Sequence, residues 1–172
     1  DSPLTITLEG SDIDGDALSY SAVSDNEDVS VSVVDAELTF TSSEDYNGTA
    51  SVTVTVSDGF LTDSETFTLT ITPVNDAPAL TSIGDQTTAE DSPLTITLSG
   101  SDIDGDALSY SAVSDNNDVS VSVVDAELTF TSSEDYNGTA SVTVTVSDGF
   151  LTDSETFTLT ITPVNDAPVF TS

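Results

Sequence analysis

Short runs in which apolar and polar residues alternate recur along the chain, and they predict β-strands. In Val142-Thr143-Val144-Thr145-Val146, for example, period-two alternation puts the valines on one face of a strand. Within residues 79–168 the runs lie in 79–90 (with a break near Gly84), 94–99, 108–112, 119–123, 128–130, 142–146 and 156–162. Gly, Asn and Asp turn signals separate them, and nothing shows the helical period of 3.6 residues. Seven short strands with this spacing indicate an all-β, antiparallel sandwich of the immunoglobulin type.

The chain repeats itself with a period of 90 residues. Residues 1–82 match residues 91–172 at all but four positions. The four differences are Glu9/Ser99, Glu27/Asn117, Ala79/Val169 and Leu80/Phe170. A unit of this length suits an independently folding β-sandwich. We therefore predict one domain at 1–78, which lacks a counterpart of the first strand, a second at 79–168, and the start of a third repeat at 169–172.

The inward positions of the strands predict one hydrophobic core per repeat. In the second repeat these core residues are Tyr110, Phe130, Val142, Val144, Phe157, Leu159 and Ile161. Their counterparts in the first are Tyr20, Phe40, Val52, Val54, Phe67, Leu69 and Ile71. The outward Thr and Ser residues are interpreted as a solvated sheet face rather than an adhesive stripe, because the alternation alone requires polar residues there.

Charge excludes several classes of function. The chain has 32 acidic residues and no Lys, Arg or His, so its formal net charge is −32. It cannot release counterions from nucleic acid, and an anionic bilayer would repel it, so we expect neither nucleic-acid binding nor membrane insertion. Without His or Cys it has no zinc, haem or iron–sulfur site of the usual kind and no Ser–His or Cys–His nucleophile. Residue 1 is Asp rather than Met, and we interpret the chain as an internal fragment of a larger protein.

Acidic residues gather in the predicted loops. Asp102, Asp104 and Asp106 fall within one short loop beside Gly105, and residues 11–16 repeat this loop. Because no cationic side chain can pair with these carboxylates, a Ca²⁺ ion, which takes six to eight oxygen ligands, suits them. A solvated acidic turn is the alternative. The glycine does not stand where an EF-hand loop needs it, so a site here would draw ligands from several loops.

Several motifs in register resemble the cadherin superfamily, specifically the bacterial cadherin-like (tandem-95 type) repeats of large surface proteins. The matching segments are Val74–Pro78 (interdomain linker), Ala89–Asp91 (acidic N-terminal motif), Ser101–Asp104 with Leu108–Ser111 (Asp-Xaa-Asp and its Tyr-Ser strand) and Val144–Gly149 (Ala-Xaa-Asp-Xaa-Gly). The first Asp of the linker motif is replaced by Pro73, and one residue before its final proline is missing. The resemblance implies two tandem seven-stranded Greek-key sandwiches.

The resemblance also implies calcium at the junctions between repeats, with ligands carried over by motif. The junction inside the chain would use Glu44, Asp45, Asn75, Asp76, Asp102, Asp104 and Asp148, with Asp106 as a weaker candidate. Half of a following junction would consist of Glu90, Glu134, Asp135, Asn165 and Asp166. Half of a preceding junction would consist of Asp12, Asp14 and Asp58.

Three functions compete. The leading hypothesis is a calcium-rigidified structural extender of a large extracellular adhesin at a cell surface, with neighbouring repeats of the same chain as its partners. The alternative is a carbohydrate-binding cadherin-like module of a secreted, polysaccharide-associated protein. It would need exposed aromatic residues, for which Phe60 and Phe150 are the candidates, although both could instead cap the sandwich. We do not expect an enzyme, because carboxylates in turns lack the apolar pocket that a catalytic acid needs.

Overall fold

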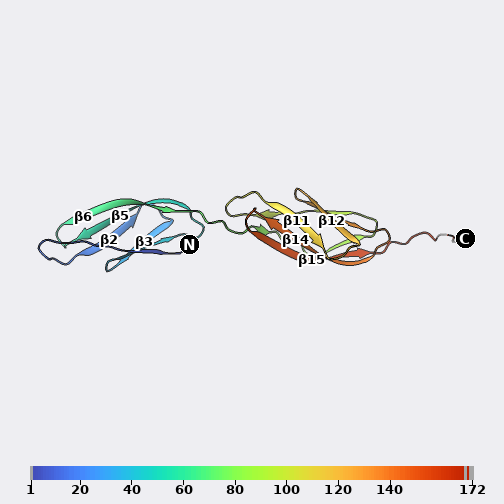
Figure 1. Cartoon of the computed structure of the whole chain (residues 1–172), viewed down its shortest axis with the longest axis horizontal. Coiled ribbons are helices and arrows are strands. Elements are labelled where there is room, and N and C mark those ends of the chain that lie inside the picture. The colour runs from blue at the N-terminus through green and yellow to red at the C-terminus, as the bar shows by residue number, and fades with distance from the viewer. Residues whose placement is uncertain (1, 169, 171–172) are drawn as a thin grey trace. The chain divides into compact units, whose positions relative to one another are not determined.

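The computed structural model describes residues 2–168 and 170, and the chain forms two compact units (Figure 1). Unit 1, here repeat 1, spans Asp1–Val74, and unit 2, here repeat 2, spans Asn75–Ser172. The four residues before Ala79, which the sequence analysis placed at the end of the first domain, thus lie with repeat 2. The predicted start of a third repeat falls mostly outside the described residues. No helix with the length and apolar character needed to cross a bilayer occurs in the described part of the chain.

Repeat 2 is the complete sandwich. Its strands are β7 (Ala79–Leu80), β8 (Gln86–Ala89), β9 (Leu94–Thr97), β10 (Gly100–Ser101), β11 (Ser109–Ser114), β12 (Val119–Val124), β13 (Glu127–Ser132), β14 (Gly138–Ser147) and β15 (Thr152–Thr162). One sheet has the order β11-β14-β15-β8 and the other β12-β13-β9, while β7 pairs with β10. The predicted all-β sandwich is confirmed, as is the break of the first strand near Gly84. The pairing of β8 with β15 is parallel, so the prediction that all strands pair antiparallel is wrong for this pair.

Among its described residues, repeat 1 has the same plan without counterparts of β7, β8 and β10. Its strands are β1 (Leu4–Thr7), β2 (Ser19–Ser24), β3 (Val29–Val34), β4 (Glu37–Ser42), β5 (Gly48–Ser57) and β6 (Thr62–Ile71). The sheets have the orders β2-β5-β6 and β1-β4-β3. The pairing of β5 with β6 runs from Gly48↔Ile71 to Ser57↔Thr62, the same register as in the β14–β15 pair. Among the described residues, β6 therefore lies at the edge of the sheet that it forms with β2 and β5.

The core of repeat 2 follows the predicted alternation. Val142, Val144 and Leu159 have no exposed surface, and the rings of Phe130 and Phe157 meet edge to face at 6.1 Å between centroids. Partly buried side chains pack around this core, among them Leu80, Ile83, Leu94, Ile96 and Tyr110. Tyr110 therefore contributes from the margin of the core, not from its centre.

The core of repeat 1 is open, although its residues are the same. Of the predicted set, Phe40 and Val52 are buried, while Val54, Phe67 and Leu69 are only partly buried. Tyr20 and Ile71 are also partly buried and lie outside the buried cluster, so their assignment to the centre of a core is wrong. The physical reason is that the described part of repeat 1 has no strand in the place where β7 and β8 cover repeat 2.

Repeat 1 is therefore expected to open more readily than repeat 2. Amide hydrogen exchange reports such local opening, because its free energy rises with buried apolar contact. Peptides that contain Glu27 or Asn117 differ in mass, so mass spectrometry can follow β3–β4 and β12–β13 separately. We expect faster exchange in the Glu27 peptides. Equal protection of the two sets would mean that the missing strand segment contributes little to the stability of the sandwich.

Candidate metal centres in repeat 2

The predicted linker residues lie against the first acidic loops of repeat 2. The side-chain amide of Asn75 donates a hydrogen bond of 2.8 Å to Asp148 Oδ2, and the backbone N–H of Asp76 donates one of 2.8 Å to Asp104 Oδ2. The loop after β10 and the loop after β14 are therefore joined by residues 75–76. Five of the predicted ligands, Asn75, Asp76, Asp102, Asp104 and Asp148, are thus brought to one end of repeat 2.

Asp102 organises the loop that follows β10. Its Oδ1 accepts hydrogen bonds from the backbone N–H groups of Asp104 (3.0 Å) and Asp106 (3.1 Å). Gly105, at φ 80°, supplies the left-handed backbone that this turn requires. Carboxylate oxygens of Asp102, Asp104 and Asp106 lie within 4.8 Å of one another. Asp102 Oδ2 is buried and has no hydrogen-bond partner within the described residues, an arrangement that a bound cation would relieve.

Asp148 holds the neighbouring turn and is itself nearly buried. Its Oδ1 accepts hydrogen bonds of 2.6 Å from the backbone N–H groups of Phe150 and Leu151. The pKa of Asp148 lies below its usual value, because the Asn75 amide and these N–H groups favour the carboxylate more than burial disfavours it. Asp148 is therefore ionised at neutral pH. With three hydrogen bonds already accepted, its main structural role is to hold Asn75 and the turn.

Repeat 1 has the same loops. Asp12 Oδ1 accepts from the backbone N–H groups of Asp14 (2.9 Å) and Asp16 (3.0 Å), as Asp102 does. Asp58 accepts from the N–H groups of Phe60 and Leu61, which lowers its pKa. Within the described residues, however, no acidic triad of this repeat meets the 4.8 Å spacing. Glu44 and Asp45 also belong to repeat 1, so their predicted sharing of a junction with residues of repeat 2 stays a prediction.

At the other end of β14, Glu90 is a buried hydrogen-bond acceptor. It is 3% exposed and accepts from the backbone N–H of Val164 (2.7 Å) and the side-chain amide of Asn137 (3.2 Å). These bonds fasten the segment that leaves β15 to the loop before β14. Of the other residues predicted here, Asn165 donates to the backbone carbonyl of Asp166, and Glu134 is not part of the triad that this end contains.

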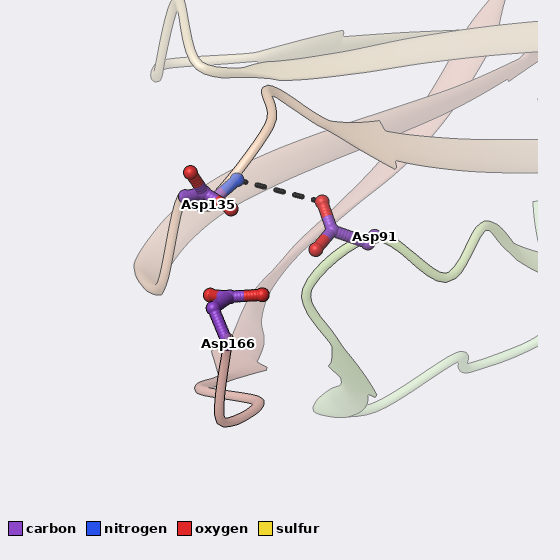
Figure 2. Close-up of side chains that lie close together, drawn as sticks. All are labelled: Asp91, Asp135 and Asp166. Carbon is purple, nitrogen blue, oxygen red and sulfur yellow. Dashed lines mark hydrogen bonds between the residues drawn. The ribbon is translucent and has the colours of Figure 1, made fainter. Parts of the chain in front are cut away.

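The triad at this end consists of Asp91, Asp135 and Asp166 (Figure 2). Their carboxylates face a common space, with oxygens within 4.8 Å of one another, and the N–H of Asp135 donates to Asp91 Oδ1 at 3.4 Å. The negative charge of Asp135 raises the pKa of Asp166, with smaller contributions from burial, Glu90 and Asp91. Asp91 is not among the candidate ligands predicted from the sequence. Asp91 directly follows Glu90 in the acidic motif Ala89–Asp91, and this position could have identified it as a candidate ligand.

Both triads offer the ligands of a hard cation. Each provides three carboxylates, and backbone carbonyls or water can complete the six to eight oxygens that Ca²⁺ takes. Mg²⁺ demands a tighter octahedral shell, which loops joined across a sandwich are less suited to form. The exposed Asp triads of the described chain could thus bind ions such as Ca²⁺.

A family model described as a bacterial Ig domain matches residues 1–72 and again residues 75–162. The chain belongs to the bacterial Ig domain family. The two matched segments correspond to repeats 1 and 2, so each repeat is one bacterial Ig domain.

One curated protein, chitinase A of Pseudoalteromonas piscicida, is 32% identical over 172 aligned residues. The match covers 92% of this chain and 20% of chitinase A, so the two bacterial Ig domains span about a fifth of that relative.

Two solved structures of human protocadherin-24 EC1-2 are similar in fold. Form II has a TM-score of 0.58 at 17% identity and covers 95% of this chain and 88% of its own. The other has a TM-score of 0.56 at 15% identity, with coverages of 93% and 88%. The predicted cadherin-like fold is thereby confirmed, whereas membership of an adhesin stays a prediction.

Proposed function

We propose that the two bacterial Ig domains form a non-catalytic accessory module of a secreted, extracellular protein that acts on polysaccharides. The similarity to chitinase A carries this proposal, because it extends over 92% of the chain. The composition supports a non-catalytic role, since a chain without His, Cys or Lys lacks the usual nucleophile–base pairs. The role of the module is to contact the polysaccharide.

The exposed aromatic turns support contact with a sugar surface. Phe150 is 82% exposed and its counterpart Phe60 is 93% exposed, so the interpretation that they cap the sandwich is wrong. Asp148 and Asp58 hold these turns through paired backbone hydrogen bonds, which fix the phenylalanine at the same place in each repeat. An exposed ring on a rigid turn can stack on the C–H face of a sugar at little conformational cost.

Binding to insoluble chitin tests this role. Phe60→Ala combined with Phe150→Ala is expected to weaken binding in a sedimentation assay about tenfold, which corresponds to about 1.4 kcal/mol. Both side chains are exposed, so the fold is expected to persist. Val34→Ala combined with Val124→Ala is the matched control, because these valines are 69% and 68% exposed at one equivalent position of each repeat. Failure of the unmodified chain to bind chitin, or equal binding by both variants, would refute the proposed contact.

A calcium-dependent spacer is the second candidate function. The acidic triads of repeat 2 and the unpaired Asp102 Oδ2 favour it. We infer that Ca²⁺ is the cation these carboxylates bind, because the chain has no side-chain cation to offset 32 acidic groups. The two roles are compatible, since a spacer in a polysaccharide-associated protein can also contact the polysaccharide.

A further inference from the structure

Strand β12 lies at the edge of its sheet in repeat 2. The sheet has the order β12-β13-β9, so among the described residues β12 has a neighbouring strand on one side only. Strand β3 has the same sequence and holds the same place in repeat 1, where the order is β1-β4-β3. Because an edge strand presents unpaired backbone groups, it is a template for pairing with a further strand.

The register of the β12–β13 pair determines which backbone groups of β12 face outward. The N–H of Ser133 donates a hydrogen bond of 2.8 Å to the carbonyl oxygen of Asp118, so these residues form a hydrogen-bonded pair. Such pairs alternate with non-hydrogen-bonded pairs along an antiparallel ladder, so the N–H and C=O groups of Val119, Val121 and Val123 point away from β13. The N–H of Val119 already donates to the preceding turn at 3.1 Å. Among the described residues, the outward groups of Val121 and Val123 are thus left for another strand.

The side chains of β12 suit the addition of a strand. Val121 and Val123 pack against the core while staying partly exposed, and Val124 is 68% exposed. A strand beside β12 would cover this apolar surface. Natural proteins commonly protect an edge with charged residues or proline, and the segment Val119–Val124 contains neither.

Charge restricts where two copies of the chain can meet. The chain has 32 acidic residues and no basic side chain, so two copies repel each other wherever their acidic loops approach. β12 and β3 have no charged side chain. An identical edge on a second copy is equally free of charge, so two such edges can come together without placing carboxylates of the strands against each other.

We propose that the β12 edge, and the identical β3 edge of repeat 1, pair with the same kind of edge on a second copy of the chain. In an antiparallel pair of β12 strands related by a two-fold axis, Val121 of one copy lies opposite Val123 of the other, which satisfies the outward backbone groups of both. Ser122 then lies opposite Ser122 of the other copy. Two three-stranded sheets become one six-stranded sheet, through a contact in which the same surface serves both partners. This contact requires neither polysaccharide nor calcium.

Salt dependence provides the first test. In about 0.01 M NaCl the Debye length is about 30 Å, so the net charge keeps copies apart, whereas in about 0.15 M NaCl it is about 8 Å and remote carboxylates are screened. With calcium removed by a chelator, sedimentation equilibrium of the full chain is expected to give the monomer mass at the lower salt. At the higher salt the mass should rise with protein concentration. Hydrogen exchange should slow at the same time in peptides that cover β3 and β12, but not in those that cover β5 and β14.

Proline at the edge tests the backbone groups. Val31→Pro combined with Val121→Pro removes one outward N–H from each edge, while the hydrogen bonds of these strands to β4 and β13 remain. Self-association at the higher salt is expected to weaken about tenfold. Circular dichroism checks that the variant is folded.

A charge substitution tests the same edge without changing the backbone. Ser32→Glu combined with Ser122→Glu puts like charges directly opposite each other in the paired strands, where Cβ atoms are about 4.5–5.5 Å apart and the higher salt does not screen them. Self-association should again weaken about tenfold. Ser21→Glu combined with Ser111→Glu is the matched control, because it adds the same charge at exposed positions of β2 and β11. The control should keep the association.

Three results would overturn the proposal. The first is a mass that stays at the monomer value at the higher salt over the whole concentration range. The second is an equal loss of association in the two glutamate variants, which would indicate repulsion unrelated to the β3 and β12 edges. The third is undiminished association of the folded proline variant, because the outward backbone groups would then not carry the contact.

Discussion

Leu159→Ala is expected to lower the free energy of unfolding of repeat 2 by about 2–5 kcal/mol, the usual cost of removing a fully buried leucine side chain. Leu159 is 0% exposed, whereas Leu69, its counterpart in repeat 1, is only partly buried. Leu69→Ala is therefore expected to cost repeat 1 clearly less. The side chains removed are identical, so the difference measures how much residues 79–90 bury in repeat 2. Urea unfolding followed by hydrogen exchange in peptides that contain Glu27 or Asn117 assigns each loss to its repeat.

A second matched pair provides the control. Leu38 and Leu128 are both 0% exposed, since each faces the centre of its own sandwich. Leu38→Ala and Leu128→Ala should therefore cost their repeats similar amounts. If Leu69→Ala proved as costly as Leu159→Ala while this control behaved as expected, the opening seen in repeat 1 would not exist in solution.

The strand pattern of the fold was predictable because alternation records which face of a strand is buried. Val142, Val144 and Leu159 lie where that pattern predicts. The same pattern could not predict that Val54 and Leu69 are less buried than Val144 and Leu159. In repeat 2 the core is also covered by residues 79–90, which lie far from these positions along the chain. The parallel pairing of β8 with β15 was missed for a related reason, since alternation is the same in parallel and antiparallel strands.

The candidate metal centres were predictable as far as topology determines which loops meet. The loops that contain Asp104 and Asp148 follow strands that end at the same side of the sandwich, and Asn75 and Asp76 bridge them. Which acidic residue forms hydrogen bonds and which is left for a cation depends on local geometry that spacing does not encode. Glu90 accepts two hydrogen bonds inside the protein, so its role as a ligand stays a prediction. The neighbouring Asp91, which was not predicted, is a member of the acidic triad.

Asp166→Asn is expected to stabilise repeat 2 in the absence of calcium and to destabilise it in the presence of calcium. In the absence of the ion, Asp135 repels the ionised carboxylate and raises the pKa of Asp166 above its usual 3.8. The folded state then binds a proton more tightly than the unfolded state. The ionised group therefore destabilises repeat 2, and stability falls as pH rises from about 4 through the raised pKa. Removing this charge should raise the melting temperature of the calcium-free chain at pH 7.

With calcium, Asp166→Asn should instead melt at a lower temperature than the unmodified chain. An ion that binds only the folded state adds about 2.7 kcal/mol per site at a free concentration 100-fold above Kd, and Asp166→Asn should lose most of this gain at its triad. Asp125→Asn removes the same charge from an exposed turn at the opposite end of β13, so it should keep the full calcium response. Calorimetry of the three chains in CaCl₂, and in NaCl of equal ionic strength, separates binding from screening. If Asp166→Asn and Asp125→Asn gained the same stability from calcium, the triad of Asp91, Asp135 and Asp166 would not be the site at which the ion acts.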